Sequence, residues 1–382
     1  MLNGIHRYPK QDEVLYGRPA AEVLPDVAQS YGAKRLLLVT TRSLAGPGGV
    51  AEQLASVLNG RCAGIFGGVR AHSPREDVIE GARRARELEC DLLVALGGGS
   101  VVDAAKVMQL CVWTGTAEAR ALDALRMGAG SSAIEPTLRM VAIPTTLSAA
   151  EFTPFAGVTD ARRRAKEGFF HPLLAPRKVV LDPGVTLATP AELWSSTGLK
   201  AVDHAVEQLC HPTRAPFADA LAEAGLERLS RGLSRCKVDP GDLVARQDCQ
   251  FGMWLSISGA TMGRGMGASH AIGHTLGGML GVAHGMTSAV MLPAVLRWNE
   301  SALGDRGPRI AKLMGSSAAT AAEAVQNLCD ELGLPTKLDS VGVHAEEFRA
   351  IAEHAIHDRS IRGNPRPIHG PEDILEILNL AR

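Results

Sequence analysis

The first half of the chain alternates short apolar runs with stretches of amphipathic or charged character. The apolar runs are rich in Val, Leu and Ile, and most lead into turn residues, as is typical of buried strands. They cover residues 35–41, 62–66, 91–100, 140–146 and 178–183. Helical patterns occupy 50–58 and 77–89, and another begins near Val101. This alternation predicts a parallel sheet with crossover helices.

The pattern changes after Pro183. Strand-type runs largely disappear, and the remaining residues form Ala- and Leu-rich segments whose periodic apolar faces predict helices. Turn residues place the boundary near 184–190. The predicted fold class is α/β, with an N-terminal Rossmann-like parallel-sheet domain over 1–184 and a C-terminal all-helical domain over 185–382. We expect a site in the cleft between the two domains.

Composition and charge narrow the classes of function. In 382 residues, 40 Lys and Arg nearly balance 41 Asp and Glu, and aromatic residues make up only 4%. Neither value favours nucleic acid as a partner, and the charge balance gives no attraction to a membrane surface. Seven scattered cysteines contain no C-x-x-C pair, which fits a reducing cytoplasm rather than a disulfide framework. The uncharged stretch 265–296 carries histidines and glycines, so we expect a buried site there rather than a membrane span.

The sequence GGGS at 97–100 lies where a predicted strand ends and a helix begins. Glycines let the backbone approach a pyrophosphate, and the helix that follows offers free N–H groups. Ser100 suits the N-cap of that helix, with Asp103 three residues later as in a capping box. A tight strand-to-helix connection without a ligand is the alternative, because the G-x-G-x-x-G fingerprint is absent.

The sequence PTT at 144–146 ends another predicted strand. It would bring two hydroxyl groups to the edge of the sheet where ligands bind in open α/β folds. A proline that ends a strand before a helix cap explains the same residues equally well.

Five segments that occur in one order carry a family resemblance: GGGSVVDAAKV, AIPTTLSAAEFT, VVLDPGVTLATP, GLKAVDHAVE and SHAIGHTLGGMLGVAHGMTSAVMLP. Together they resemble the iron-containing alcohol dehydrogenases over residues 17–299. HTLGG at 274–278 and NPRPI at 364–368 are similar to the maleylacetate reductases of that group. The resemblance implies NAD(H) or NADP(H) as cofactor, a helical metal- or substrate-binding domain, and a homodimer.

Carried over by position, the resemblance implies a set of cofactor-binding residues. The pyrophosphate would lie against Gly97, Gly98, Gly99 and Ser100, with Asp103 in the turn that follows, and the nicotinamide half against Thr145, Thr146, Phe152 and Lys166. Thr41 lies in the segment where many relatives have an acidic residue that contacts the adenosine ribose. Without that carboxylate, and with Arg42 beside it, a 2′-phosphate is not repelled, so NADPH and NADH both fit.

In metal-binding relatives, one Asp and three His residues hold Fe²⁺ or Zn²⁺. The histidines match His204, His270 and His284, but Lys200 stands at the Asp position, one helical turn before His204. Asp203 does not replace the missing ligand, because adjacent helical residues diverge by about 100°. An ammonium group beside a dication disfavours the metal, so we expect no tightly bound metal. Three histidines can still hold zinc, which keeps the metal-dependent alternative open.

The leading hypothesis is a cytoplasmic NAD(P)H-dependent reductase of a small oxo compound, resembling maleylacetate reductase. Lys200, with or without His270, would stabilise the developing oxyanion, and His274 or His284 would relay the proton. Arg366 would bind a substrate carboxylate, although a surface turn explains it equally well. The alternatives are a metal-dependent alcohol dehydrogenase, a non-redox lyase or cyclase on a dehydroquinate-synthase-like scaffold, and a non-catalytic binding protein.

Overall fold

The computed structural model describes residues 8–127, 136–163 and 165–382, without the side chains of residues 262, 263 and 284. Within these ranges the chain divides into two compact units, one over Pro9–Thr189 and the other made of Tyr8 and Pro190–Arg382. The division lies at the end of the turn segment near 184–190 that the sequence marks as the boundary.

The N-terminal unit is built on a six-stranded parallel sheet of order β1-β8-β5-β4-β2-β3. Its strands are β1 (Glu13–Tyr16), β2 (Leu36–Val39), β3 (Cys62–Phe66), β4 (Leu92–Gly97), β5 (Arg139–Pro144) and β8 (Lys178–Leu181). Every residue of β2, β4 and β8 is buried, which explains why these strands read as continuous apolar runs. All five predicted strands are confirmed, whereas β1 was not predicted.

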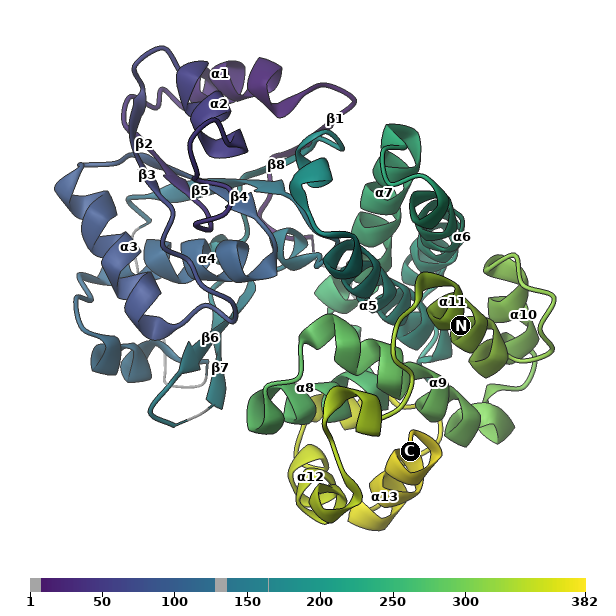
Figure 1. Ribbon diagram of the computed structural model, residues 1–382. Helices are drawn as coiled ribbons and strands as arrows, with labels where there is room; N and C mark the ends of the chain where they lie inside the picture. The colour runs from purple at the N-terminus through teal and green to yellow at the C-terminus, as the bar shows by residue number, and fades with distance from the viewer. Residues whose placement is uncertain (1–7, 128–135, 164) are drawn as a thin grey trace. The chain divides into compact units, whose positions relative to one another are not determined.

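Helices cover both faces of this sheet. The helices α1 (Ala20–Ser30) and α2 (Val50–Ser56) lie on one face, and α3 (Arg75–Glu87) and α4 (Gly99–Thr114) lie on the other (Figure 1). Successive side chains of β2 alternate between the two apolar cores, so that Leu38 packs on the α1 side and Leu37 on the α4 side. The predicted Rossmann-like architecture is confirmed.

An antiparallel hairpin, which was not predicted, lies outside the main sheet. It consists of β6 (Phe155–Asp160) and β7 (Ala165–Phe170). Arg75, which is fully buried at the start of α3, pairs with Asp160 and Glu167 of the hairpin and with Asp123. These ion pairs hold the hairpin against α3. Short 3₁₀ helices complete the unit: η1 (Ala119–Leu125), η2 (Ala150–Phe152), η3 (Pro172–Leu174) and η4 (Val185–Ala188).

The C-terminal unit contains no strand in the part of it that the structure describes, as predicted. Its helices are α5 (Ala191–Cys210), α6 (Pro216–Val238), α7 (Leu243–Gly259), the π-helix η5 (Ala260–Arg264), α8 (Ala268–Leu280), α9 (His284–Leu303), α10 (Arg306–Leu313), α11 (Ala321–Leu332), α12 (Phe348–Ala355) and α13 (Pro371–Leu380), with short 3₁₀ turns η6 (Asp339–Val341), η7 (Ala345–Glu347) and η8 (Arg359–Gly363). An apolar core joins α8, α9, α12 and α13. Among the described helices, none is both long enough and apolar enough to span a bilayer.

Candidate active site

The glycine turn joins β4 directly to α4. Gly97 ends β4 with φ of 154°, Gly98 precedes the helix, and α4 begins at Gly99. A Cβ on Gly98 would lie 2.9 Å from the Oγ1 and Cγ2 atoms of Thr146, and the Gly97 carbonyl accepts a hydrogen bond of 3.1 Å from the Thr145 amide. The turn therefore packs directly on the end of β5, as expected from the carboxyl-edge rule.

The predicted capping role of Ser100 is wrong. The helix begins at Gly99 with Gly98 as N-cap, and no side chain caps it. Ser100 lies inside the first turn, where its Oγ accepts a hydrogen bond of 3.0 Å from the His72 amide. Asp103 forms no capping box and instead accepts a hydrogen bond of 3.1 Å from the Gly157 amide of the hairpin. The glycines extend the helix two residues further back than the apolar pattern indicates.

A buried lysine that the sequence analysis overlooked shapes the segment after β5. Lys106 is fully buried on α4 and donates hydrogen bonds of 2.6 Å to the carbonyls of Ala150 and Phe155. These bonds fix the backbone on either side of Phe152, one of the predicted cofactor residues. Burial lowers the Lys106 pKa to about 8. A lysine within a mostly apolar helical segment, VVDAAKVMQL, is the signal that could have found it.

The other predicted cofactor residues lie on different elements of the same unit. Thr145 and Thr146 are buried just beyond β5, and Lys166 lies on β7. The Thr41 hydroxyl, just beyond β2, shares a hydrogen bond of 2.9 Å with Ser43. Their contacts with a dinucleotide stay predictions.

Two helices of the C-terminal unit bring together the predicted catalytic residues. Lys200 and His204 lie one turn apart on α5, and His270 and His274 lie one turn apart on α8. The rings of His204 and His270 stack with centroids 5.0 Å apart, and the His274 ring meets His270 edge-on at 6.1 Å. The side chain of His284, at the start of α9, lies outside the described residues.

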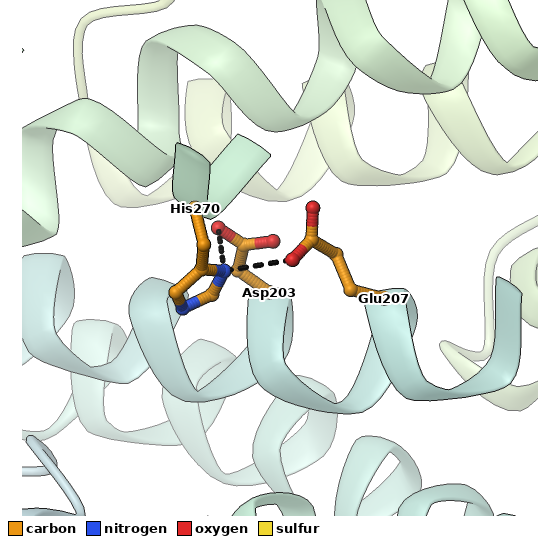
Figure 2. A group of neighbouring side chains, drawn as sticks. All are labelled: Asp203, Glu207 and His270. Carbon is orange, nitrogen blue, oxygen red and sulfur yellow. Dashed lines mark hydrogen bonds and ion pairs between the residues drawn. The ribbon is translucent and has the colours of Figure 1, made fainter. Parts of the chain in front are cut away.

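Two buried carboxylates on α5 hold His270 in place (Figure 2). Its Nδ1 atom is 2.8 Å from Glu207 and 3.5 Å from Asp203. Glu207 also accepts hydrogen bonds from the amides of Gly267 and Ser269, so its carboxylate caps the N-terminus of α8. Asp203 accepts a hydrogen bond of 2.7 Å from the Ser269 hydroxyl. The sequence analysis missed this pair, although its i, i+4 spacing within an apolar helix was visible.

Burial controls the charges of this cluster. It lowers the pKa of His270 to about 4 and that of His204 well below its usual value, and the nearby Lys200 charge lowers both further. Burial raises the pKa values of Asp203 and Glu207 to about 7. Both imidazoles are therefore neutral near pH 7. Both Glu207 oxygens already accept backbone amides, so we assign the hydrogen of this contact to His270 Nδ1, which places the lone pair of the ring on Nε2.

His274 differs from the other two described histidines because it reaches solvent. Its side chain is 48% exposed, and its Nδ1 atom is 2.8 Å from Asp358. The hydrogen bond to His274 lowers the pKa of Asp358 despite the opposing effect of burial. An exposed imidazole held by a carboxylate can exchange protons with water and pass them inward.

The described side chains bear in two ways on whether a divalent metal can bind, and the expectation that none is tightly bound stays a prediction. Lys200 stands where the resemblance places the carboxylate of the metal ligand set, and an ammonium supplies no lone pair while protonated. Asp203 and Glu207 lie on the Nδ1 side of His270 and are engaged by Ser269 and by the backbone of α8. The His204 ring does have a nitrogen to offer, because its buried Nδ1 has no hydrogen-bond partner among the described residues. Asp203, Glu207 and His270 also bring their ligand atoms within 4.8 Å of one another, so carboxylate oxygens and an imidazole nitrogen are both available to an ion.

Arg366 is held against a tryptophan. Its guanidinium lies 3.8 Å from the centre of the Trp298 ring and donates a hydrogen bond of 2.9 Å to the Trp298 carbonyl. The neighbouring Asn364 exchanges hydrogen bonds with Asn299 on α9. The NPRPI segment therefore has a structural role, and a contact of Arg366 with substrate stays a prediction.

Comparisons with known proteins agree with this architecture. The iron-containing alcohol dehydrogenase model matches residues 11–183, and the C-terminal model of the same family matches residues 195–381. The maleylacetate reductase of Burkholderia cepacia is 31% identical, with 96% of this chain and 94% of the relative covered. The 4-hydroxybutyrate dehydrogenase of Cupriavidus necator is 32% identical, with 91% and 92% covered. The crystal structure of maleylacetate reductase from Agrobacterium tumefaciens has a TM-score of 0.83 at 28% identity and covers 100% of this chain and 98% of that one.

The fold, the glycine turn and these likenesses define an oxidoreductase of the class that acts on alcohols, carbonyl compounds or oxo acids. Within that class, the chain belongs to the iron-containing alcohol dehydrogenase family. These relatives are named reductases or dehydrogenases, so they lend no support to the lyase alternative.

Proposed function

We propose that this protein is an NAD(P)H-dependent reductase of small oxo acids in which the Lys200 ammonium takes the place of the family's metal. The observation that carries the proposal is the combination of Lys200 with two neutral imidazoles. Lys200 lies one turn before His204, and its charge lowers the pKa values of both His204 and His270. Lys200 therefore lies close enough for its charge to act on both rings, as that of His274 also does.

The N-terminal unit would hold the dinucleotide. The N-terminus of α4 offers backbone N–H groups with no side-chain cap, and glycines at 97–99 let a pyrophosphate approach. The bound dinucleotide would supply the hydride that reduces the substrate carbonyl. Thr41 and the exposed Arg42 at the end of β2 leave room for either NADH or NADPH.

The C-terminal unit would polarise the carbonyl and supply the proton. Lys200 would donate a hydrogen bond to the carbonyl oxygen and stabilise the negative charge that develops there. His274, which is exposed and held by Asp358, would accept a proton from solvent and pass it toward the alkoxide. The buried carboxylates would act as positioning groups, because Glu207 fixes the tautomer of His270.

The substrate class rests on the relatives. Maleylacetate and 4-hydroxybutyrate, the compounds in the names of two of them, are both carboxylates with an oxo or hydroxy group. We therefore infer that this protein also takes a carboxylate with a nearby carbonyl group.

A matched pair of substrates tests this function. 4-Oxobutanoate and butanal present the same aldehyde on the same chain length, and only the first carries a carboxylate. With chelator-treated enzyme, oxidation of NADH or NADPH should be at least about ten-fold more efficient with 4-oxobutanoate or maleylacetate than with butanal. Equal rates with butanal would exclude carboxylate recognition, and failure to oxidise either cofactor with any of the three would reject the reductase proposal.

One observation favours the metal-dependent alternative: the buried His204 Nδ1 has no partner among the described residues. If a metal is required, the chelator should abolish turnover and added Zn²⁺ or Fe²⁺ should restore it.

The resemblance also implies a homodimer, and light scattering of the purified protein would test that expectation.

A further inference from the structure

Two cysteines of the C-terminal unit face each other between consecutive helices. Cys236 lies near the end of α6 and Cys249 in the second turn of α7, and each thiol influences the pKa of the other. Gly232 lies one turn before Cys236, and a Cβ added to it would be 2.7 Å from the Cys249 sulfur. The Cys249 side chain therefore lies on the face of α6 that also carries Cys236.

The surroundings of Cys236 favour its thiolate. Arg246 is buried beside the pair, and its guanidinium lies 4.6 Å from the centre of the Trp194 ring. Contact with the Cys249 thiol, together with the indole of Trp194 and the charge of Arg246, lowers the Cys236 pKa despite burial. A cationic site with a lowered thiol pKa is the environment in which cysteines react with oxidants.

The other cysteines lack this environment. All seven lie in the described part of the chain, and the structure records them as free thiols. Cys62 and Cys90 are more exposed than Cys236, yet burial raises the pKa of the Cys62 thiol and raises that of Cys90 to about 11. Burial likewise raises the pKa values of Cys111 and Cys210 to about 12. The two more exposed cysteines, Cys62 and Cys90, are therefore not the ones whose surroundings favour the thiolate.

We propose that Cys236 and Cys249 form a reversible disulfide when the protein meets a hydroperoxide. The Cys236 thiolate attacks one peroxide oxygen, so that an S–O bond forms, the O–O bond breaks, and hydroxide leaves and takes up a proton. The Cys249 sulfur then attacks the Cys236 sulfenic acid, so that the S–S bond forms and the hydroxyl leaves as water. Overall, two thiols are oxidised and one hydrogen peroxide is reduced to two waters.

Trp194 lies beside the pair, so its fluorescence should report the formation of the disulfide. Helix α5 packs against both α6 and α7, and its first turn carries Trp194 beside Cys236. Disulfide formation removes the thiolate next to this indole and changes the field around it. The fluorescence of Trp194 should therefore change on oxidation, and a Trp194→Phe variant would identify the part of the signal that comes from this residue.

Mass spectrometry of the whole protein tests the proposal. After treatment with hydrogen peroxide, digestion without reductant should yield one cross-linked peptide pair that contains Cys236 and Cys249, and dithiothreitol should release it. In Cys249→Ser the reaction should stop at a Cys236 sulfenic acid that dimedone traps. A cross-link between Cys62 and Cys90, or oxidation of Cys236 and Cys249 no faster than that of the other five thiols, would overturn the proposal.

Cys329→Ser is the matched control. Cys329 is also fully buried in the helical unit, and its thiol lies 3.9 Å from the Ala289 carbonyl rather than against another cysteine. This variant should form the 236–249 cross-link at the wild-type rate. If Cys249→Ser fails to fold, the wild-type and Cys329→Ser digests still decide the matter, because the proposal requires the same cross-linked pair in both.

Discussion

Replacement of Gly98 by alanine tests how the glycine turn is built. The φ angle of Gly98 is −82°, which any residue adopts, so the substitution introduces no backbone strain. Its new Cβ, however, would lie 2.9 Å from both Oγ1 and Cγ2 of Thr146 and 3.5 Å from the Thr146 Cβ. Two of these contacts are too short for ordinary packing, so either α4 or Thr146 has to shift. Such overpacking costs about 1–3 kcal/mol.

A double-mutant cycle isolates that contact. Thr146→Ala removes both short contacts and leaves a Cβ–Cβ distance of ordinary van der Waals length. The Thr146 Oγ1 is buried without a hydrogen-bond partner among the described residues, so Thr146→Ala alone should cost only about 1 kcal/mol for the lost methyl group. Urea unfolding should therefore give a favourable coupling of about 1–2 kcal/mol between the two substitutions.

Gly278→Ala on α8 is the matched control. Its Cβ would meet no atom within 4 Å, so alanine should stabilise the helix by up to about 1 kcal/mol. In the Gly98→Ala variant, displacement of the α4 N-terminus should also weaken dinucleotide binding roughly ten-fold or more. A Gly98→Ala variant as stable as wild type, or a loss that Thr146→Ala leaves unchanged, would refute this account of the turn.

Three further predictions concern stability. Arg75→Met should lower the free energy of unfolding by about 1.5–3 kcal/mol in urea titrations, because it removes the fully buried cation that Asp160 and Glu167 share and leaves them only their more exposed arginine partners; a change below about 1 kcal/mol would contradict this role. Hydrogen bonds from Arg162 hold the Asp160 pKa below its usual range, so ionised Asp160 contributes to the free energy of unfolding. That contribution is complete above about pH 4 and is lost as the pH falls toward the pKa of Asp160 in the folded protein. Asp160→Asn should therefore make the free energy of unfolding fall less steeply below about pH 4. Thr320→Ala removes the N-cap of the α11 capping box and should cost about 1 kcal/mol, whereas an unchanged urea midpoint would show that the cap contributes nothing.

The four central strands of the main sheet, β8, β5, β4 and β2, were predictable because almost all of their residues are buried. A continuous apolar run such as LLVALG by itself indicates a strand that is buried on both faces, without knowledge of its tertiary neighbours. Both edge strands are partly exposed, but β3 is an apolar run, CAGIF, whereas β1, EVLY, begins with a charged residue and has only two apolar aliphatic residues, so it escaped prediction.

The hairpin and the carboxylate pair escaped prediction for a different reason. Asp160 and Glu167 are charged residues that hydropathy assigns to the surface, yet they are buried against Arg75, which is far away in sequence and pairs with both. Asp203 and Glu207 are likewise buried because α8 supplies a hydroxyl, backbone amides and an imidazole. Burial of a charge depends on tertiary partners, which a pattern along one segment does not contain.

The grouping of Lys200, His204, His270 and His274 followed from helical spacing together with the family resemblance. Spacing alone places Lys200 beside His204 and His270 beside His274, but it does not bring α5 and α8 together. The resemblance supplied that second step, and the ring contact between His204 and His270 agrees with it.

Metal content measured by elemental analysis in wild type and in Lys200→Asp tests the central claim most directly. The substitution restores the carboxylate of the family's ligand set beside the histidines that the resemblance implies. After dialysis against Zn²⁺ and then buffer, Lys200→Asp should retain about one zinc ion per chain, and wild type should retain almost none. Stoichiometric metal in carefully purified wild type would contradict the claim that Lys200 replaces the metal's charge.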